Sequence, residues 1–190
     1  MCSCLEMRVE PESVKLKDGR TVLVRNAQKG DGVKVHAYLS VLGGSTDFIL
    51  TTPEDIRPAQ MYEENIERIQ QGEFYSISAI DPVSGSIVGN TSFNFGTRKK
   101  ITHVAGLGTG VLPEWQGIGL GSWMLSRCIE DMRANPKIHR LELTVIKGND
   151  NAQRMYERAG FVVEGCKSRS IRQPDGSHVD EIQMGMWIGE

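Results

Sequence analysis

The loop PEWQGIGLG at residues 113–121 separates two regular segments of the chain. Residues 103–112 before it follow a strand pattern, and residues 122–132 after it follow the pattern of an amphipathic helix. Such a turn aims several backbone N–H groups at one point, beside the positive end of the helix dipole. Its three alternating glycines let an anion approach the main chain without a Cβ in the way. The loop is therefore either a site for a pyrophosphate or a tight strand-to-helix connection without a ligand.

Two common nucleotide-binding motifs do not fit this loop. A Rossmann fingerprint needs GxGxxG early in a βαβ repeat, with an acid about 20 residues further on. The loop instead reads GxGxG and lies past the middle of the chain. A P-loop needs GxxxxGK[ST], which the sequence lacks.

Strand and helix patterns continue on both sides of the loop. The strand patterns lie at residues 20–25, 74–80, 86–95, 103–112, 140–146, 161–166 and 179–186. The helical patterns lie in two pieces between about 30 and 72, at 122–132, and from Asn149 to the closing Gly160. Residues 1–15 are polar and aperiodic, which favours a flexible N-terminal arm. Because we find no repeat or linker, we predict a single α/β domain.

Length and charge exclude several classes of protein. The chain has 190 residues and a net charge of −2, which gives no basic face for duplex DNA or an anionic membrane. No apolar run approaches the roughly 18 residues that span a bilayer. The first ten residues contain Glu6, Arg8 and Glu10, so they form no signal-peptide core. We expect a cytoplasmic protein without nucleic-acid or membrane partners, and the sequence leaves a homodimer open.

Cysteine and histidine spacing indicates neither a disulfide framework nor a metal site. The cysteines lie at 2, 4, 128 and 166, and the histidines at 36, 103, 139 and 178. Four scattered cysteines are too few for a secreted disulfide framework, and Cys2-Ser3-Cys4 has no second pair at zinc-finger spacing. The histidines form no HExxH motif. We therefore predict no metal.

Two motifs together resemble the GNAT superfamily of N-acetyltransferases. Residues 111–121, VLPEWQGIGLG, resemble the family's acyl-CoA signature Q/R-x-x-G-x-G/A, which follows a strand and a bend containing Pro. Residues 149–161, NDNAQRMYERAGF, match its second motif, N-x-x-A-x-x-x-Y-x-x-x-G-F. Both occur in the expected order and separation, and the order of predicted elements from about 20 to 188 is similar. Residues 160–184 further resemble the branch of RimJ/RimL-like and bacterial amino-acid N-acetyltransferases.

The resemblance implies a GNAT-type α/β (α+β) fold and a cofactor. Residues 16–190 would form one acyl-CoA N-acyltransferase domain, with a mixed, mostly antiparallel sheet of six or seven strands flanked by about four helices. Acetyl-CoA would be the co-substrate, and its acetyl group would pass directly to a primary amine in a ternary complex. The expected cofactor-binding residues are Val111, Leu112, Gln116, Gly117, Ile118, Gly119, Leu120, Gly121, Ser122, Asn149, Ala152 and Tyr156. Main-chain N–H groups between Thr109 and Leu112 would face the thioester.

Tyr156 is the expected general acid. It lies four residues after Ala152 and hence on the same face of the predicted helix. In the family the matching tyrosine often protonates the departing thiolate. A phenol of pKa about 10 can protonate a thiol of pKa about 8.5 only if the site tunes that difference. The alternative is a tyrosine packed in the core. Asn149 can cap this helix, hydrogen-bond the pantetheine arm, or do both.

The general base is not evident. Many relatives carry a Glu on the strand before the glycine loop, but residues 103–112 contain no carboxylate. His103 is the one titratable side chain there, and its ordinary pKa near 6.5 suits a catalytic proton relay. A structural histidine is the alternative. Glu164, after Phe161, is a second candidate, expected at the substrate.

The sequence leaves the acceptor open. By resemblance, the helices at 30–72 and the loop near 169–178 would border its site. Residues 54–73 carry six acids and two arginines, either an acidic rim that favours a cationic amine or a solvated helix face. The acceptor is an amino acid, another small amine or a protein N-terminus. A non-catalytic acyl-CoA-binding sensor is the alternative function, favoured by the missing strand carboxylate and opposed by Tyr156.

Overall fold

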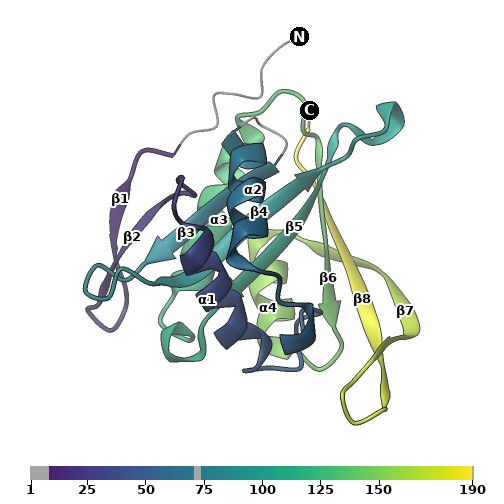
Figure 1. Cartoon of the computed structure of the whole chain (residues 1–190). Coiled ribbons are helices and arrows are strands. Elements are labelled where there is room, and N and C mark those ends of the chain that lie inside the picture. The colour runs from purple at the N-terminus through teal and green to yellow at the C-terminus, as the bar shows by residue number, and fades with distance from the viewer. Residues whose placement is uncertain (1–8, 71–73, 190) are drawn as a thin grey trace.

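Eight strands form one mixed sheet (Figure 1). The computed structural model describes residues 9–70 and 74–189. The strands are β1 (Glu12–Lys15), β2 (Thr21–Asn26), β3 (Phe74–Ile80), β4 (Ile87–Phe95), β5 (Val104–Val111), β6 (Arg140–Ile146), β7 (Val162–Arg172) and β8 (His178–Trp187). Their order is β1-β2-β3-β4-β5-β6-β8-β7, and every neighbouring pair is antiparallel except β5 with β6.

Four α-helices cover the two faces of the sheet. They are α1 (Gly32–Gly43), α2 (Ala59–Gln70), α3 (Leu120–Arg133) and α4 (Asp150–Ala159). In Figure 1, α1 and α2 lie in front of the sheet and α3 and α4 behind it. The main core forms between the sheet and α3, whose residues Leu120, Met124, Cys128 and Met132 are almost fully buried. The predicted amphipathic stripe of this helix is thus confirmed. No helix in the described part of the chain is long and apolar enough to cross a lipid bilayer.

Two boundaries differ from the sequence predictions for identifiable reasons. The expected helix from about 54 begins only at Ala59, because Pro58 disfavours helical backbone at Arg57. A short 3-10 turn precedes it. Strand β1 lies within the segment expected to be a flexible arm, since Val14 is buried opposite Val22 of β2. Residues 1–8 of that arm lie outside the described residues. The sheet therefore has eight strands rather than six or seven.

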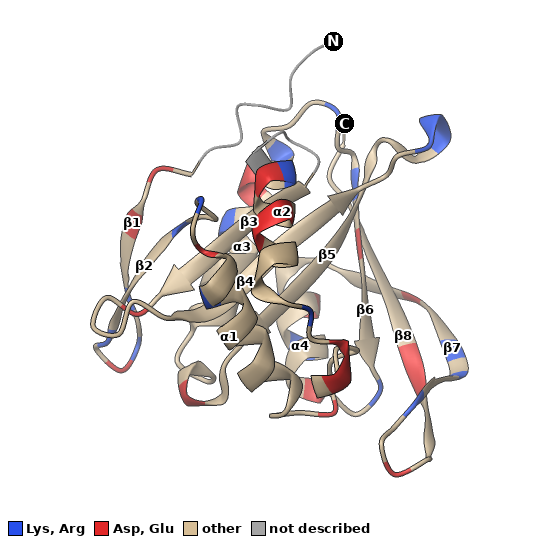
Figure 2. Ribbon diagram, viewed as in Figure 1, with Lys and Arg blue, Asp and Glu red and all other residues tan. Residues whose placement is uncertain are grey.

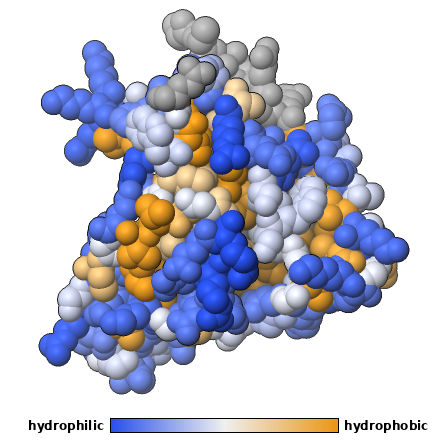
Figure 3. Space-filling model, turned by 180° about the vertical axis from the view of Figure 1, so that it is seen from behind, coloured by the Kyte–Doolittle hydropathy of each residue, from blue (hydrophilic) through white to orange (hydrophobic). Residues whose placement is uncertain are grey.

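Some apolar side chains stay at the surface near the β7 edge of the sheet. Val162 and Val163 of β7 and Trp187 of β8 are each more than half exposed. Figure 3 shows the molecule from behind, with hydrophobic patches separated by hydrophilic side chains. Scattered apolar exposure of this kind is common and indicates no partner by itself. The homodimer left open by the sequence therefore stays untested.

The parallel strands β5 and β6 pair over only part of their length. Their ladder joins Val104–Gly106 to Arg140–Glu142 and ends there. β5 continues alongside β4 as far as Val111, and β6 continues alongside β8 as far as Ile146. The two strands therefore diverge, as Figure 1 shows. We call the diverging part the β5–β6 opening.

Candidate active site

Backbone N–H groups of β5 face the β5–β6 opening. Leu112 N–H donates to Val88 O of β4 at 2.9 Å, which fixes the alternation of the antiparallel ladder. Even-numbered residues of β5 therefore point their backbone groups at β4, while Thr109 and Val111 point theirs at the opening. The Gln116 side chain donates to Val111 O at 2.8 Å from that side. In the expected stretch from Thr109 to Leu112, only Thr109 and Val111 can donate their backbone N–H groups to a ligand in the opening. The N–H of Leu112 already donates to Val88 O.

The glycine loop leads from the end of β5 into α3. Gly117 and Gly119 have φ of 73° and 94°, a left-handed conformation that favours glycine. Gly119 occupies the N-cap position of α3 and has no side chain to cap it. The N–H groups of the first helical turn are therefore free of a side-chain cap, as an anion site requires. Leu120 contributes only this backbone, since its side chain lies in the core.

The turn between β1 and β2 packs on the glycine loop. Lys17 N–H donates to Ile118 O at 3.2 Å, and a Cβ added to Gly119 would lie 3.3 Å from Lys17 Cε. Arg20 donates to Glu114 O at 2.8 Å and stacks 4.2 Å from the centre of the Trp115 ring. The lysine stem, rather than a ligand, thus fills the bare side of Gly119. Sequence reasoning missed this cation, because no local signal links residues about one hundred positions apart.

The second motif forms α4 beside the loop. Asn149 Oδ1 accepts the N–H of Ala152 at 3.2 Å, so the predicted cap is confirmed. A Cβ on Gly121 would lie 3.5 Å from Met155 Sδ, which places α3 and α4 in close contact at the loop.

Tyr156 of α4 is buried but keeps its hydroxyl accessible. Its ring packs 5.9 Å from that of Phe161, and burial raises the pKa of Tyr156 to about 12. In the described part of the chain the Tyr156 hydroxyl makes no hydrogen bond. Every fully buried polar side-chain atom there does have a hydrogen-bond partner. The hydroxyl must therefore retain solvent contact, as a proton donor to a ligand needs. The core packing and the catalytic interpretation are compatible.

The structure does not bring His103 to the opening. His103 precedes the closed end of β5, eight residues or roughly 26 Å of strand from Val111. Its ring packs at 6.3 Å from those of His139 and Trp187. The expectation that His103 relays the substrate proton is therefore corrected, because the sequence could not show which end of β5 opens.

Glu164 is engaged elsewhere as well. Its carboxylate accepts two hydrogen bonds from Arg140, one of them at 2.8 Å, and this contact lowers the pKa of Glu164. The pair lies over Gly185 of β8, two strands away from β5. Glu164 thus holds Arg140 rather than a group at the opening.

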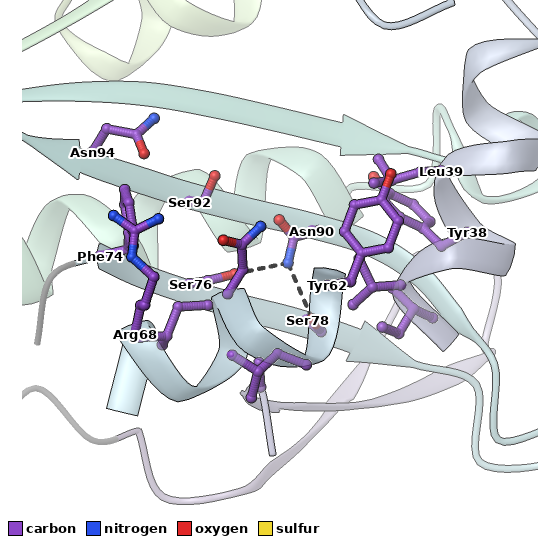
Figure 4. A pocket seen from close by; sticks show the side chains of 16 residues that line it. Tyr38, Leu39, Tyr62, Arg68, Phe74, Ser76, Ser78, Asn90, Ser92 and Asn94 are labelled. Atoms are coloured by element: carbon purple, nitrogen blue, oxygen red, sulfur yellow. Dashed lines mark hydrogen bonds between the residues drawn. The ribbon is translucent and has the colours of Figure 1, made fainter. Parts of the chain in front are cut away.

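A cavity of about 470 Å³ lies between the helices α1 and α2 and the strands β3 and β4 (Figure 4). Its floor consists of every second side chain of the two strands, and its roof is mostly apolar. The floor residues are Ser76, Ser78, Asn90, Ser92 and Asn94, and the apolar roof includes Val35, Leu39, Ile66 and Ile69. Polar residues at every second position of two central strands were the available sequence signal for this cavity, and sequence reasoning did not use it.

Two residues that line the cavity, Asn90 and Tyr38, lie directly against Gly110 of β5. Asn90 pairs directly with Gly110, and a Cβ on Gly110 would lie 2.7 Å from the hydroxyl of Tyr38. Both Asn90 and Tyr38 line the cavity. Gly110 in turn lies between Thr109 and Val111, whose N–H groups face the opening. Gly110 is therefore the strand residue that lies between these two N–H groups and next to the residues that line the cavity.

The acids of residues 54–73 do not line this cavity where the structure describes them. The Glu63 carboxylate instead accepts the N–H groups of Gly30 and Gly32 at 2.6 and 2.9 Å, which joins α2 to the start of α1. Figure 2 shows the acidic residues of α2 and of the turn before it. Glu73 lies outside the described residues. The described acids of this segment thus form no rim of the cavity.

The β7–β8 loop contacts the connection between α1 and α2. Gln173, in the β7–β8 loop, donates to Asp47 O in the α1–α2 connection at 3.3 Å. No three His, Cys, Asp or Glu side chains of residues 9–70 and 74–189 gather as metal ligands would.

Comparison with known proteins places this site in a family. The sequence profile of the acetyltransferase (GNAT) family matches residues 46–161, more than half of the chain, and this stretch includes both motifs. The L-amino acid N-acetyltransferase AaaT of Escherichia coli (strain K12) is 31% identical over 103 residues. That match covers 54% of this chain and 62% of AaaT, less than two thirds of the length of that protein.

Solved structures share the fold over most of the chain. A GNAT-family acetyltransferase from Streptococcus pneumoniae has a TM-score of 0.82 and 26% identity, over 87% of this chain and 99% of that chain. YncA from Salmonella typhimurium, solved with its cofactor acetyl-CoA, has a TM-score of 0.78 and 20% identity, over 89% and 95% of the two chains. The profile match confirms the family that the two motifs indicated. The chain belongs to the GNAT family of acetyltransferases.

Proposed function

We propose that this protein is an acetyl-CoA-dependent N-acetyltransferase whose acceptor is the primary amine of a free L-amino acid. The observation that carries the proposal is the position of Gly110, between the β5–β6 opening and the cavity. A donor held in the opening and an acceptor held in the cavity would meet there. The match to an L-amino acid N-acetyltransferase supports the acceptor class. We expect the reaction in the cytoplasm, where acetyl-CoA and amino acids are both available.

The glycine loop and β5 would hold the cofactor. The uncapped first turn of α3 suits the pyrophosphate, and Val111 N–H suits an amide oxygen of the pantetheine arm. Bound acetyl-CoA would supply an activated thioester. Thr109 N–H would then stabilise the carbonyl oxygen as it gains negative charge, an interaction typically worth a few kcal/mol.

Proton transfers would use groups on both sides of the opening. Tyr156 is protonated at neutral pH and would deliver that proton to the departing sulfur. Burial raises its pKa to about 12, which widens the difference from the thiol, so the bound cofactor would have to lower this pKa for the transfer. On the acceptor side, Glu142 pairs with Gly106 and lies on the face of the sheet that carries the cavity. Thr109 is three residues or roughly 10 Å further along β5, so Glu142 would take the amine proton through water.

An acceptor screen tests the proposal. Free thiol release from acetyl-CoA is followed with L-amino acids, spermidine and a peptide that begins with alanine. We expect turnover of at least one L-amino acid, and no turnover of the same compound when its α-amine is blocked. Binding of acetyl-CoA without any turnover would favour the sensor alternative. Turnover of only spermidine or the peptide would overturn the acceptor assignment.

A further inference from the structure

We infer that Asn90 and Tyr38 bind the amine and the carboxylate of the acceptor amino acid at the end of the cavity next to Gly110. The inference rests on the proposed transfer to a free amino acid, and it names the side chains that recognise this class of acceptor. Only the Gly110 end of the cavity is involved. The other end, where Asn94 pairs with Phe74, lies four residues or roughly 13 Å further along β4.

The side chain of Asn90 offers a hydrogen-bond acceptor to the cavity. Its amide nitrogen donates to Ile77 O at 3.0 Å and to the hydroxyls of Ser76 and Ser78 at 2.9 and 3.0 Å (Figure 4). Since a backbone carbonyl only accepts, the contact with Ile77 O fixes which way the amide points. No described residue donates to the Asn90 Oδ1, whereas every fully buried polar side-chain atom of the described residues has a partner. The Oδ1 atom is therefore open to the cavity that Asn90 lines.

The hydroxyl of Tyr38 offers a hydrogen-bond donor beside Gly110. A Cβ on Gly110 would lie 2.7 Å from this hydroxyl, which therefore occupies the space of a side chain at that position. Tyr38 lines the cavity, and the backbone N–H of Asn90 contacts its hydroxyl oxygen. No described residue accepts the hydroxyl proton. Burial raises the pKa of Tyr38, so the proton stays in place at neutral pH and is available to a ligand.

One small ligand can reach both groups. Asn90 and Gly110 lie directly opposite each other in the β4–β5 ladder, where Cβ positions on one face of a sheet are roughly 4.5–5.5 Å apart. Because the Tyr38 hydroxyl takes the Gly110 position, it lies about one such step from the Asn90 side chain. An amine held by Asn90 Oδ1 would lie next to Gly110, between Thr109 and Val111, whose N–H groups face the opening. The amine would thus be held where the acetyl group has to arrive.

This pair of groups is complementary to a free α-amino acid. Such a molecule carries a hydrogen-bond donor, the amine, and an acceptor, the carboxylate, on one carbon atom. A bond from Tyr38 to a carboxylate is charge-assisted and therefore stronger than a bond to a neutral carbonyl. A peptide N-terminus and an amino-acid amide offer only the neutral carbonyl, and spermidine has no oxygen acceptor. The pair therefore favours a free amino acid over all three.

Tyr38→Phe tests the carboxylate contact. The acceptors are the smallest L-amino acid that the wild-type protein acetylates and its α-carboxamide, which keeps the amine and loses the charge. The variant should lower kcat/KM for the acid at least about tenfold and for the amide less than about threefold, as expected for one hydrogen bond to a charged group. Comparing the acid-to-amide ratio between variant and wild type cancels the different basicities of the two amines. Tyr62→Phe, whose hydroxyl lines the same cavity and accepts the N–H of Arg57 at 3.0 Å, is the matched control and should leave the ratio unchanged.

Asn90→Ala tests the amine contact. It should lower kcat/KM for the acid and the amide alike, at least about tenfold, and leave the Kd of acetyl-CoA from calorimetry unchanged. Asn135→Ala is the matched control, because Asn135 follows α3 outside the cavity lining and its side chain accepts the N–H of Lys137 at 3.1 Å. This control should change neither quantity. Urea unfolding shows which variants are folded, and if Asn90→Ala is not, Tyr38→Phe decides alone.

The outcomes distinguish this inference from the proposed function. An unchanged acid-to-amide ratio in Tyr38→Phe, including equal losses for the acid and the amide, would assign Tyr38 to packing and overturn the inference, while acetyl transfer to amino acids would stand. An unchanged kcat/KM in folded Asn90→Ala would overturn the inference in the same way. Binding of acetyl-CoA without turnover of any L-amino acid would overturn the proposed function and this inference with it.

Discussion

Gly106 of β5 pairs with Glu142 of β6 at the last rung of their parallel ladder, so the Glu142 side chain lies beside bare backbone where the two strands begin to separate. Nothing packs on Gly106 closer than 3.9 Å from an added Cβ, and the side chain of Glu142 is about half exposed. Its contact to Arg140 is a loose one of 3.6 Å. We propose that this carboxylate on the neighbouring strand takes the place of the one that β5 lacks.

Glu142→Gln tests that replacement. If Glu142 accepts the amine proton through water, the variant should lose roughly 10²-fold in kcat/KM. The measurement is kcat/KM against pH with the best acceptor. Glu130→Gln, on the exposed side of α3, is the matched control. Profiles of Glu142→Gln and wild type that superimpose would leave water alone as the proton acceptor.

Tyr156→Phe should lower kcat without weakening acetyl-CoA binding. The hydroxyl is used only as the sulfur departs, so its loss belongs to the transition state and should cost roughly 10²–10⁴-fold. The check is kcat with saturating acetyl-CoA, together with the Kd of acetyl-CoA from calorimetry. A kcat within about threefold of wild type would show that Tyr156 packs in the core and is not the general acid.

Ionisation of Tyr156 should lower the free energy of unfolding at alkaline pH. Its pKa is raised to about 12 in the folded protein against about 10 unfolded, so the unfolded state loses its proton first as the pH rises. The contribution to the free energy of unfolding is complete below pH 10 and declines between pH 10 and 12, by about 3 kcal/mol in total. Urea unfolding across this range should show a steeper decline for wild type than for Tyr156→Phe. Parallel declines would contradict the raised pKa.

Alanine substitutions at Gly110 and Gly108 should distinguish a packed position on β5 from an open one. A Cβ at Gly110 would lie 2.6 Å from Leu42 Cδ2 and 2.7 Å from the Tyr38 hydroxyl, so Gly110→Ala must displace these two buried side chains of α1. We expect a loss of about 1–3 kcal/mol in the free energy of unfolding. At Gly108 the nearest atom would be Ser92 Oγ at 3.8 Å, an ordinary contact, and Gly108→Ala should lose no stability. The measurement is urea unfolding of the two variants. Equal losses in the free energy of unfolding would contradict the conclusion that Gly110 is packed and Gly108 is open.

Local signals were sufficient for the elements that carry the motifs. The alternation at residues 140–146 predicted β6 to the residue, and the asparagine cap with its closing glycine bounded α4. Strand β1 carried too weak a signal, because Val14 is the one apolar residue of its four. Its pairing with β2 supplies the stability that its own sequence lacks.

The arrangement of the site depended on contacts that the sequence does not display. The position of His103 on a strand was predicted, but the end at which β5 and β6 separate is set by pairing between residues 36 positions apart. The acids of α2 were visible, whereas the side of the helix that faces the sheet follows from packing against β3 and β4. Spacing along the chain therefore identified the glycine loop, and only the assembled sheet located the cavity between α1, α2, β3 and β4.

The packing of Lys17 against Gly119 lets the β1–β2 turn act on the glycine loop from outside the stretch that the family profile matches. The family profile begins at residue 46, well after the β1–β2 turn. Changes of length or charge in that turn can therefore accumulate during evolution without touching either motif. If the glycine loop holds the acyl donor, two related chains with identical glycine loops can then differ in the concentration of acetyl-CoA at which they saturate.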